Sequence, residues 1–175
     1  TVTLGLIGAL KRLGHTVAAA KVGPDYIDPK FLEAASGGRC INLDPWAMSP
    51  EQLRARLADH ATAADIVVVE GVMGLFDGAE GGGGATADLA SALELPVILI
   101  VDASRQAQSI AALVHGFATF RPDIQVAATI ATRVGSDRHA AMITSALAPL
   151  PMPHLGSVQS KQALTVRSRH LGLVQ

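Results

Sequence analysis

The sequence has 175 residues, of which 49% are hydrophobic but only 3% aromatic, so its core must consist mainly of aliphatic side chains. The length predicts one domain over residues 1–175, and a formal net charge of −1 gives no electrostatic basis for binding nucleic acid or an anionic membrane. One cysteine, Cys40, excludes an internal disulfide and a multi-cysteine zinc site and fits a reducing cytoplasm, and no apolar run reaches the ~18 residues of a membrane span.

The first half of the chain alternates helices with short strands. Apolar residues at positions 2, 6, 10 and 13 have helical spacing, and because no cap precedes them we expect a strand and a turn upstream of Thr1. The next segments are predicted as a strand, a loop, a helix and a strand, over 16–22, 23–29, 29–35 and 40–43. Ser49 as N-cap and Pro50 as first residue predict a helix that ends near Ala61.

The second half continues this alternation. The β-branched run 66–69 is typical of a strand buried on both faces, and Thr86 is predicted to cap a helix after the flexible glycine run 80–85. The remaining segments are predicted as strand, helix, strand, loop, helix and strand, over 96–102, 106–120, 126–131, 132–136, 137–147 and 154–158. The pattern predicts an α/β fold, a three-layer sandwich with a mainly parallel sheet and right-handed crossovers.

Two acidic loops follow strands of this predicted sheet. Glu70 ends the strand 66–69, and Asp77 follows it among the glycines at 71, 74 and 78. Ligands of open α/β sheets lie beyond the carboxyl ends of the strands, and carboxylates there suit Mg²⁺. Lys21, Asp25 and Asp28 form a similar group after the strand 16–22. Solvated acids that cap nearby amides, or an ordinary surface ion pair, would also explain these residues, but two such loops at neighbouring strand ends favour a functional site.

Other polar residues have simpler explanations. Asp102 and Ser104 follow the strand 96–102 and are interpreted as helix-capping residues, whereas Arg133 and Ser136 either meet a nucleotide or cap a helix. The histidines at 115, 139 and 170 lack metal-ligand spacing and are interpreted as structural or surface residues.

The segments 21–29 (KVGPDYIDP) and 70–78 (EGVMGLFDG), with 86–90 (TADLA) and 169–174 (RHLGLV), resemble the cobyrinic acid a,c-diamide synthase family over most of its N-terminal synthetase domain. The resemblance implies a P-loop NTPase-like fold of the dethiobiotin-synthetase type, whose first strand and Gly-Lys-Thr loop would precede Thr1. On that expectation the chain alone binds ATP poorly and is inactive by itself.

The resemblance also implies an activity, an ATP- and Mg²⁺-dependent ligase reaction in cobalamin biosynthesis. The a- and c-acetate carboxylates of cobyrinic or hydrogenobyrinic acid become acyl phosphates, which ammonia from a separate glutaminase domain attacks. Cys40 is not the glutaminase nucleophile, and a homodimer is compatible with this assignment. Cobyric acid synthase shares the architecture, but its first motif differs. The sequence is also compatible with a diamide synthase for another tetrapyrrole, a partitioning-type ATPase or a non-catalytic remnant.

The same resemblance assigns roles to individual residues. The expected catalytic residues are Asp25, Glu70 and Asp77, with Asp25 and Glu70 also binding the metal. Substrate or phosphate contacts are expected from Lys21, Tyr26 and Asp28, and nucleotide contacts from Thr1 and Arg133. The chain departs from the family pattern at Leu32, where His is usual, and at Thr132, where Asn is usual.

Overall fold

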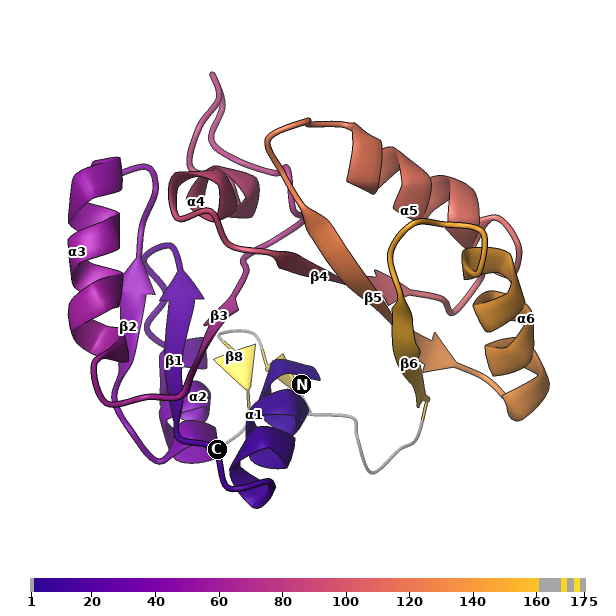
Figure 1. Cartoon of the computed structure of the whole chain (residues 1–175), viewed down its shortest axis with the longest axis horizontal. Helices are drawn as coiled ribbons and strands as arrows, with labels where there is room; N and C mark the ends of the chain where they lie inside the picture. Colours follow the sequence, from indigo (N-terminus) through magenta and orange to yellow (C-terminus); the bar gives the residue numbers. More distant parts are fainter. Residues whose placement is uncertain (1, 161–167, 170–171, 174–175) are drawn as a thin grey trace. The chain divides into compact units, whose positions relative to one another are not determined.

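The computed structural model describes residues 2–160, 168–169 and 172–173. Its internal contacts divide the chain into two compact units, 1–93 with 166–175 and 94–165, and each unit is an α/β structure described here by itself (Figure 1). The prediction of a single domain over the whole chain stays a prediction. Within the described residues, no helix combines the length and the apolar character that crossing a membrane requires.

The first unit is built on a parallel sheet with the strand order β2-β1-β3. Its elements in chain order are α1 (Val2–Arg12), β1 (Val17–Val22), α2 (Asp28–Ser36), β2 (Cys40–Leu43), α3 (Pro50–Ala61), β3 (Ile66–Glu70), α4 (Thr86–Ala92), β7 (Ser168–Arg169) and β8 (Gly172–Leu173). The short strands β7 and β8 pair with each other, antiparallel.

Helices cover both faces of this sheet. Ala19 of the central strand β1 packs with Leu32 of α2 and with a residue of α1, and neighbouring Ala20 packs with Leu53 of α3 and with a residue of α4. Successive strand residues point to opposite faces, so two helices are held on each side. The first unit therefore has the predicted three layers, and the small side chains of β1 allow close packing in the middle one.

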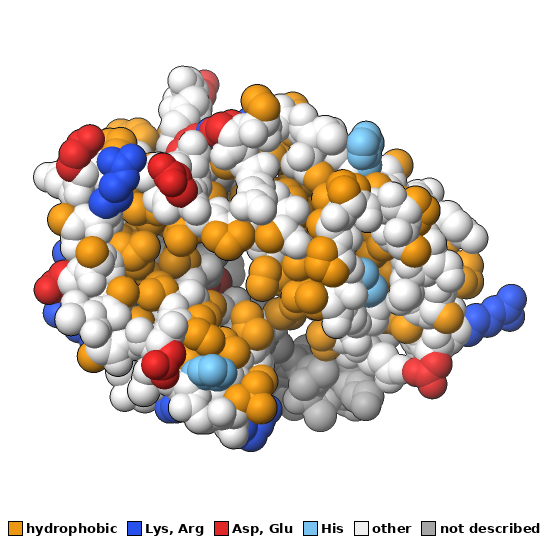
Figure 2. Space-filling model, viewed as in Figure 1, with side chains coloured by type: hydrophobic (Ala, Val, Ile, Leu, Met, Phe, Trp, Pro, Cys, Tyr) orange, Lys and Arg blue, Asp and Glu red, His pale blue; other side chains and the backbone are white. Residues whose placement is uncertain are grey.

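The second unit has the parallel strand order β4-β5-β6. Its elements are β4 (Val97–Asp102), α5 (Ile110–Thr119), β5 (Val126–Val134), α6 (Asp137–Leu147) and β6 (His154–Gln159). Leu99 and Val101 of β4 are buried, whereas Ile98 and Ile100, which alternate with them, are 40% and 43% exposed. In the space-filling view hydrophobic side chains are visible at the surface among scattered charged ones (Figure 2).

The expectation that strand 66–69 is buried on both faces is wrong for this structure. All five residues of β3 are only half-buried, because β3 is at the edge of its three-stranded sheet. β4 is likewise an edge strand, and its residues alternate between covered and exposed positions. A run of β-branched residues predicted the strands correctly but not how much neighbouring structure covers them.

Several element boundaries also differ from the expected ones. Ser49 does cap α3, by a capping box with Gln52, but Thr86 is the first residue of α4 and not its N-cap. The helix expected from about 106 begins at Ile110, and its N-cap is Ser109, so the interpretation of Asp102 and Ser104 as helix caps is wrong. Asp102 instead accepts a hydrogen bond from the Ser104 amide in a turn that precedes the helix. The strand expected to end at 131 continues to Val134, so most of the segment 132–136 that was expected as a loop belongs to β5.

Candidate active site

Lys21 and Glu70 lie side by side at the carboxyl ends of β1 and β3. In the parallel register, Lys21 is opposite Glu70 on one side and Asn42 on the other. Lys21 shares its strand face with Ala19, so it points toward the layer that contains α2. The loop that follows β1 leads directly into α2, which begins at Asp28. The predicted grouping of the loops after these two strands is confirmed.

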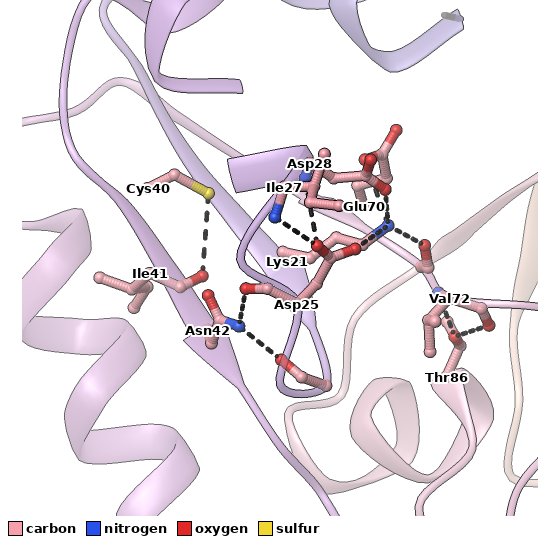
Figure 3. Close-up of polar contacts among 12 residues, drawn as sticks. Lys21, Asp25, Ile27, Asp28, Cys40, Ile41, Asn42, Glu70, Val72 and Thr86 are labelled. Carbon is pink, nitrogen blue, oxygen red and sulfur yellow. Dashed lines mark hydrogen bonds and ion pairs between the residues drawn. The ribbon is translucent and has the colours of Figure 1, made fainter. Parts of the chain in front are cut away.

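The Lys21 ammonium is surrounded by oxygens of this chain (Figure 3). Its Nζ lies 2.8 Å from Asp28 Oδ2 and 3.3 Å from Glu70 Oε2, and it donates a hydrogen bond of 3.0 Å to the carbonyl oxygen of Gly71. Asp25 Oδ2 is farther away, at 3.9 Å. The Lys21 side chain is only 5% exposed, whereas the three carboxylates are partly accessible to solvent. We call these four side chains the Lys21 cluster.

Charge determines the protonation of this lysine. Burial lowers the pKa of Lys21, but the hydrogen bond to Asp28 and the negative charges of Glu70 and Asp28 outweigh burial, so the pKa is raised above its ordinary value. The ammonium therefore stays charged at neutral pH. One cation among three carboxylates leaves an excess of negative charge, and any anionic group that enters the cluster needs an additional cation.

Asn42 supports the loop that carries Asp25, and sequence reasoning missed it. Its Nδ2 donates to the carbonyl oxygens of Gly23 and Asp25, at 2.8 and 2.6 Å. Asp25 in turn accepts hydrogen bonds from the amides of Ile27 and Asp28 through Oδ1, at 2.8 and 3.1 Å. The only sequence signal for Asn42 was a polar residue within an apolar strand. Asp25 thus orders the loop, and Oδ2 is its oxygen that faces the cluster.

Thr86 supports the loop after β3. Its hydroxyl accepts from the amide of Val72 at 3.0 Å and donates to the carbonyl of the same residue at 3.1 Å. This contact requires glycine at position 71, because a Cβ on Gly71 would lie 2.9 Å from the Thr86 methyl group. Since the Gly71 carbonyl is a Lys21 acceptor, the start of α4 helps to position the cluster.

Three of the predicted site residues lie elsewhere or cannot be placed. Asp77 is exposed, and its Oδ2 accepts from the Gly74 amide at 3.0 Å instead of meeting Lys21. Tyr26 is 80% exposed, so most of its ring faces solvent. Thr1 lies outside the described residues. Their expected roles in catalysis, substrate binding and nucleotide binding stay predictions.

Arg133 belongs to the second unit, where it pairs with Asp102. Its Nη1 is 3.1 Å from Asp102 Oδ2, and its backbone is left-handed, with φ of 56°. The hydrogen bond from the Ser104 amide, with the Arg133 charge, lowers the pKa of Asp102. Ser136 caps α6 by accepting from the His139 amide, which confirms the capping interpretation for that residue.

The donor chemistry of the Lys21 cluster fits Mg²⁺. Asp28 and Glu70 each contact the Lys21 ammonium through one carboxylate oxygen. Within the described residues, no protein group forms a hydrogen bond or ion pair with the second oxygen of either carboxylate. No group of three or more His, Cys, Asp or Glu side chains among the described residues is arranged as a metal site by itself. Mg²⁺ commonly takes only one or two carboxylates and completes its shell with water and phosphate oxygens, so oxygens from Glu70 and its neighbours are sufficient.

Cys40 lies in β2 and is buried. Burial, with the nearby Glu33 carboxylate, raises the pKa of its thiol to about 11. We therefore expect iodoacetamide at pH 8 to alkylate the folded protein at least about tenfold more slowly than the same protein in urea, because little thiolate forms in the folded state. Mass spectrometry of timed samples measures both rates. Equal rates would contradict a buried, protonated thiol.

Comparisons with known proteins identify the family of this chain. The family model described as CobQ/CobB/MinD/ParA nucleotide binding domain matches residues 1–173. Hydrogenobyrinate a,c-diamide synthases from Brucella anthropi and Rhizobium meliloti are 56% identical over 177 residues and 55% identical over 175 residues. These alignments cover 100% of this chain but only 40% and 41% of the relatives' lengths. The resemblance to the cobyrinic acid a,c-diamide synthase family is confirmed.

A solved structure supports the fold assignment. The structure of chloroplast FtsY from Physcomitrella patens matches with a TM-score of 0.61 and 14% identity, over 91% of this chain and 55% of that one. At this identity the likeness concerns the fold alone, and it confirms a P-loop NTPase-like α/β fold. With a family model that covers residues 1–173, the chain belongs to the CobQ/CobB/MinD/ParA nucleotide binding domain family.

Proposed function

We propose that this chain is the ATP- and Mg²⁺-dependent synthetase part of a hydrogenobyrinate or cobyrinate a,c-diamide synthase in cobalamin biosynthesis. The observation that carries the proposal is the Lys21 cluster, in which Asp25, Asp28 and Glu70 gather at the carboxyl ends of β1 and β3. The names of the similar proteins supply the substrate, a corrinoid with a- and c-acetate groups.

The proposed reaction has two steps for each carboxylate. A carboxylate oxygen attacks the γ-phosphorus of ATP, which forms an acyl phosphate and releases ADP. Ammonia, supplied by a glutaminase domain, then attacks the acyl carbon, and the C–O bond to phosphate breaks to give the amide and hydrogen phosphate, which takes up the proton that the nitrogen loses. Phosphorylation is needed because a free carboxylate is a poor electrophile at neutral pH.

The residues of this chain position charge for the phosphoryl transfer. Mg²⁺ held by Asp25 and Glu70 would neutralise phosphate charge when it is bound. Without a cation the negative cluster repels phosphate, so the carboxylates make the site selective for a metal-bound nucleotide. Asp77 and Tyr26, on the loops after β3 and β1, are proposed to contact the reacting groups once the substrate is bound.

Lys21 is proposed to act mainly as a positioning residue. An ammonium has three N–H donors, and three oxygens of this chain lie within 3.3 Å of its Nζ. A phosphate or carboxylate ligand must therefore displace one of these partners to bind Lys21 directly. The geometry favours a lysine that holds Asp28, Glu70 and Gly71 in place for the ligand.

Oxygen transfer tests this proposal. The full natural protein that contains this chain is incubated with ATP, Mg²⁺, ammonium and hydrogenobyrinic acid labelled with ¹⁸O in its acetate carboxylates. We expect the a,c-diamide as product and one labelled oxygen in the phosphate for each amide formed. ATP hydrolysis without diamide, or diamide with unlabelled phosphate, would contradict the reaction. Cobyrinic acid and a non-corrin tetrapyrrole, tested in parallel, identify the preferred substrate.

A partitioning-type ATPase is the second candidate, because the matching family model also includes MinD and ParA. Such a protein would hydrolyse ATP in response to a macromolecular partner and independently of any corrinoid carboxylate. The same assay separates the two, since only the synthetase requires the corrinoid for phosphate release.

A further inference from the structure

Two large hydrophobic side chains are exposed at the edge of the sheet that carries the Lys21 cluster. Trp46 is 73% exposed and follows Leu43, the last residue of β2, by three positions. Met73 is 79% exposed and follows Glu70, the last residue of β3, by three positions. Because the strands are parallel and β1 lies between them, both side chains stand beyond the same carboxyl edge, on either side of the loop after β1.

The backbone holds both side chains in defined places. The Trp46 amide donates to Asp44 Oδ1 at 2.9 Å, and Gly84 packs beneath Trp46, since a Cβ on Gly84 would lie 3.1 Å from the Trp46 Cβ. Met73 has a left-handed backbone with φ of 54°, which is unfavourable for a residue with a side chain. Strain of this kind persists where the surrounding structure imposes it, and it occurs often in ligand-binding loops.

We infer that Trp46, with Met73, holds the apolar face of the corrinoid macrocycle while one of its acetate groups reaches the Lys21 cluster. This inference rests on the proposed function. The wide ring of such a substrate must cover several loops when an acetate at its edge enters the cluster. Neighbouring strands are about 4.8 Å apart, so β2 and β3 are separated by roughly 10 Å, a span that a macrocycle can bridge.

An aromatic ring at this position contributes affinity and leaves the reaction unchanged. Contact with the macrocycle is the same before and after phosphoryl transfer, so it lowers KM without altering kcat. Replacement by alanine removes the indole ring but keeps the Cβ, which is the Trp46 atom nearest to Gly84. Trp46 and Met73 thus become determinants of substrate specificity, distinct from the carboxylates that act on phosphate.

Steady-state kinetics of the full natural protein test this inference. For Trp46→Ala we expect the KM for hydrogenobyrinic acid to rise about tenfold, with kcat and the KM for ATP within about twofold of wild type. Trp46→Phe should regain most of the affinity. Met73→Gly should also raise the KM, and because it relieves the left-handed strain its melting temperature should not fall. The control is Leu13→Ala, since Leu13 is 76% exposed at the opposite edge of the sheet, before β1.

The outcomes separate this inference from the proposed function. If wild type forms the diamide and Trp46→Ala has an unchanged KM for the corrinoid, the inference is wrong and the proposed function stands. A fall in kcat with unchanged KM would also contradict it, because it would mean that Trp46 acts on the chemistry. If wild type forms no diamide, the proposed function fails and this inference with it. Circular dichroism of each variant verifies that the fold is retained.

Discussion

Replacing Lys21 by methionine is expected to lower the free energy of unfolding by about 2–4 kcal/mol and to abolish diamide formation. Lys21 is 5% exposed and is the cation shared by Asp25, Asp28 and Glu70, so its removal leaves three carboxylates facing one another. Urea-induced unfolding at pH 7, followed by circular dichroism, measures the loss. The pKa of Lys21 is higher in the folded protein than in the unfolded chain, so the charged lysine stabilises the fold. This contribution is fully present at pH 7, below the pKa of the unfolded chain, and is lost only as the pH rises through the pKa of the folded protein.

The matched control is Lys30→Met. The Lys30 side chain is 73% exposed, and its ion pair with Glu33 spans 2.8 Å at the surface. Exposed pairs of this kind contribute up to about 1 kcal/mol, so this variant should unfold close to wild type and remain active. Addition of Asp28→Asn to Lys21→Met should recover part of the lost stability, because it removes one of the repelling charges. Equal losses for the two lysine variants would show that Lys21 is an ordinary surface lysine.

Replacing Glu70 by glutamine is expected to lower kcat for diamide formation by about 10²–10³-fold while the protein stays folded. Glutamine keeps the shape of the side chain and one oxygen to accept from Lys21, so the change mainly removes the negative charge proposed to bind Mg²⁺. Initial rates of diamide formation measure the effect, and a rise in the Mg²⁺ concentration needed for half-maximal rate should accompany it.

Glu51→Gln is the control for this variant, because Glu51 is an exposed acid in the first turn of α3 whose ion-pair partner is Arg54. It should retain the wild-type rate. Wild-type activity of Glu70→Gln with an unchanged Mg²⁺ requirement would remove Glu70 from the proposed site and leave the Lys21 cluster with a structural role only.

Local signals in the sequence were reliable where the interaction itself is local. Ser49 was predicted as the cap of α3, and capping of α6 was one of the two roles predicted for Ser136. Each accepts a hydrogen bond from an amide three residues later. Thr86 also has a side-chain hydroxyl, but the prediction that it caps α4 is wrong. Its hydroxyl bonds instead to Val72, 14 positions earlier in the chain, and no local pattern reveals that partner.

The sequence by itself determined the alternation of helices and strands, the parallel α/β class and the two acidic loops, because periodicity and turn residues act through neighbours along the chain. Only the tertiary structure decided which acidic side chains lie close to Lys21. Lys21 and Glu70 are 49 positions apart, and the register of β1 against β3 brings them together. Asp77 was predicted beside them but turns back to the Gly74 amide. Contacts between distant segments depend on register and on how loops close, which are properties of the packed sheet.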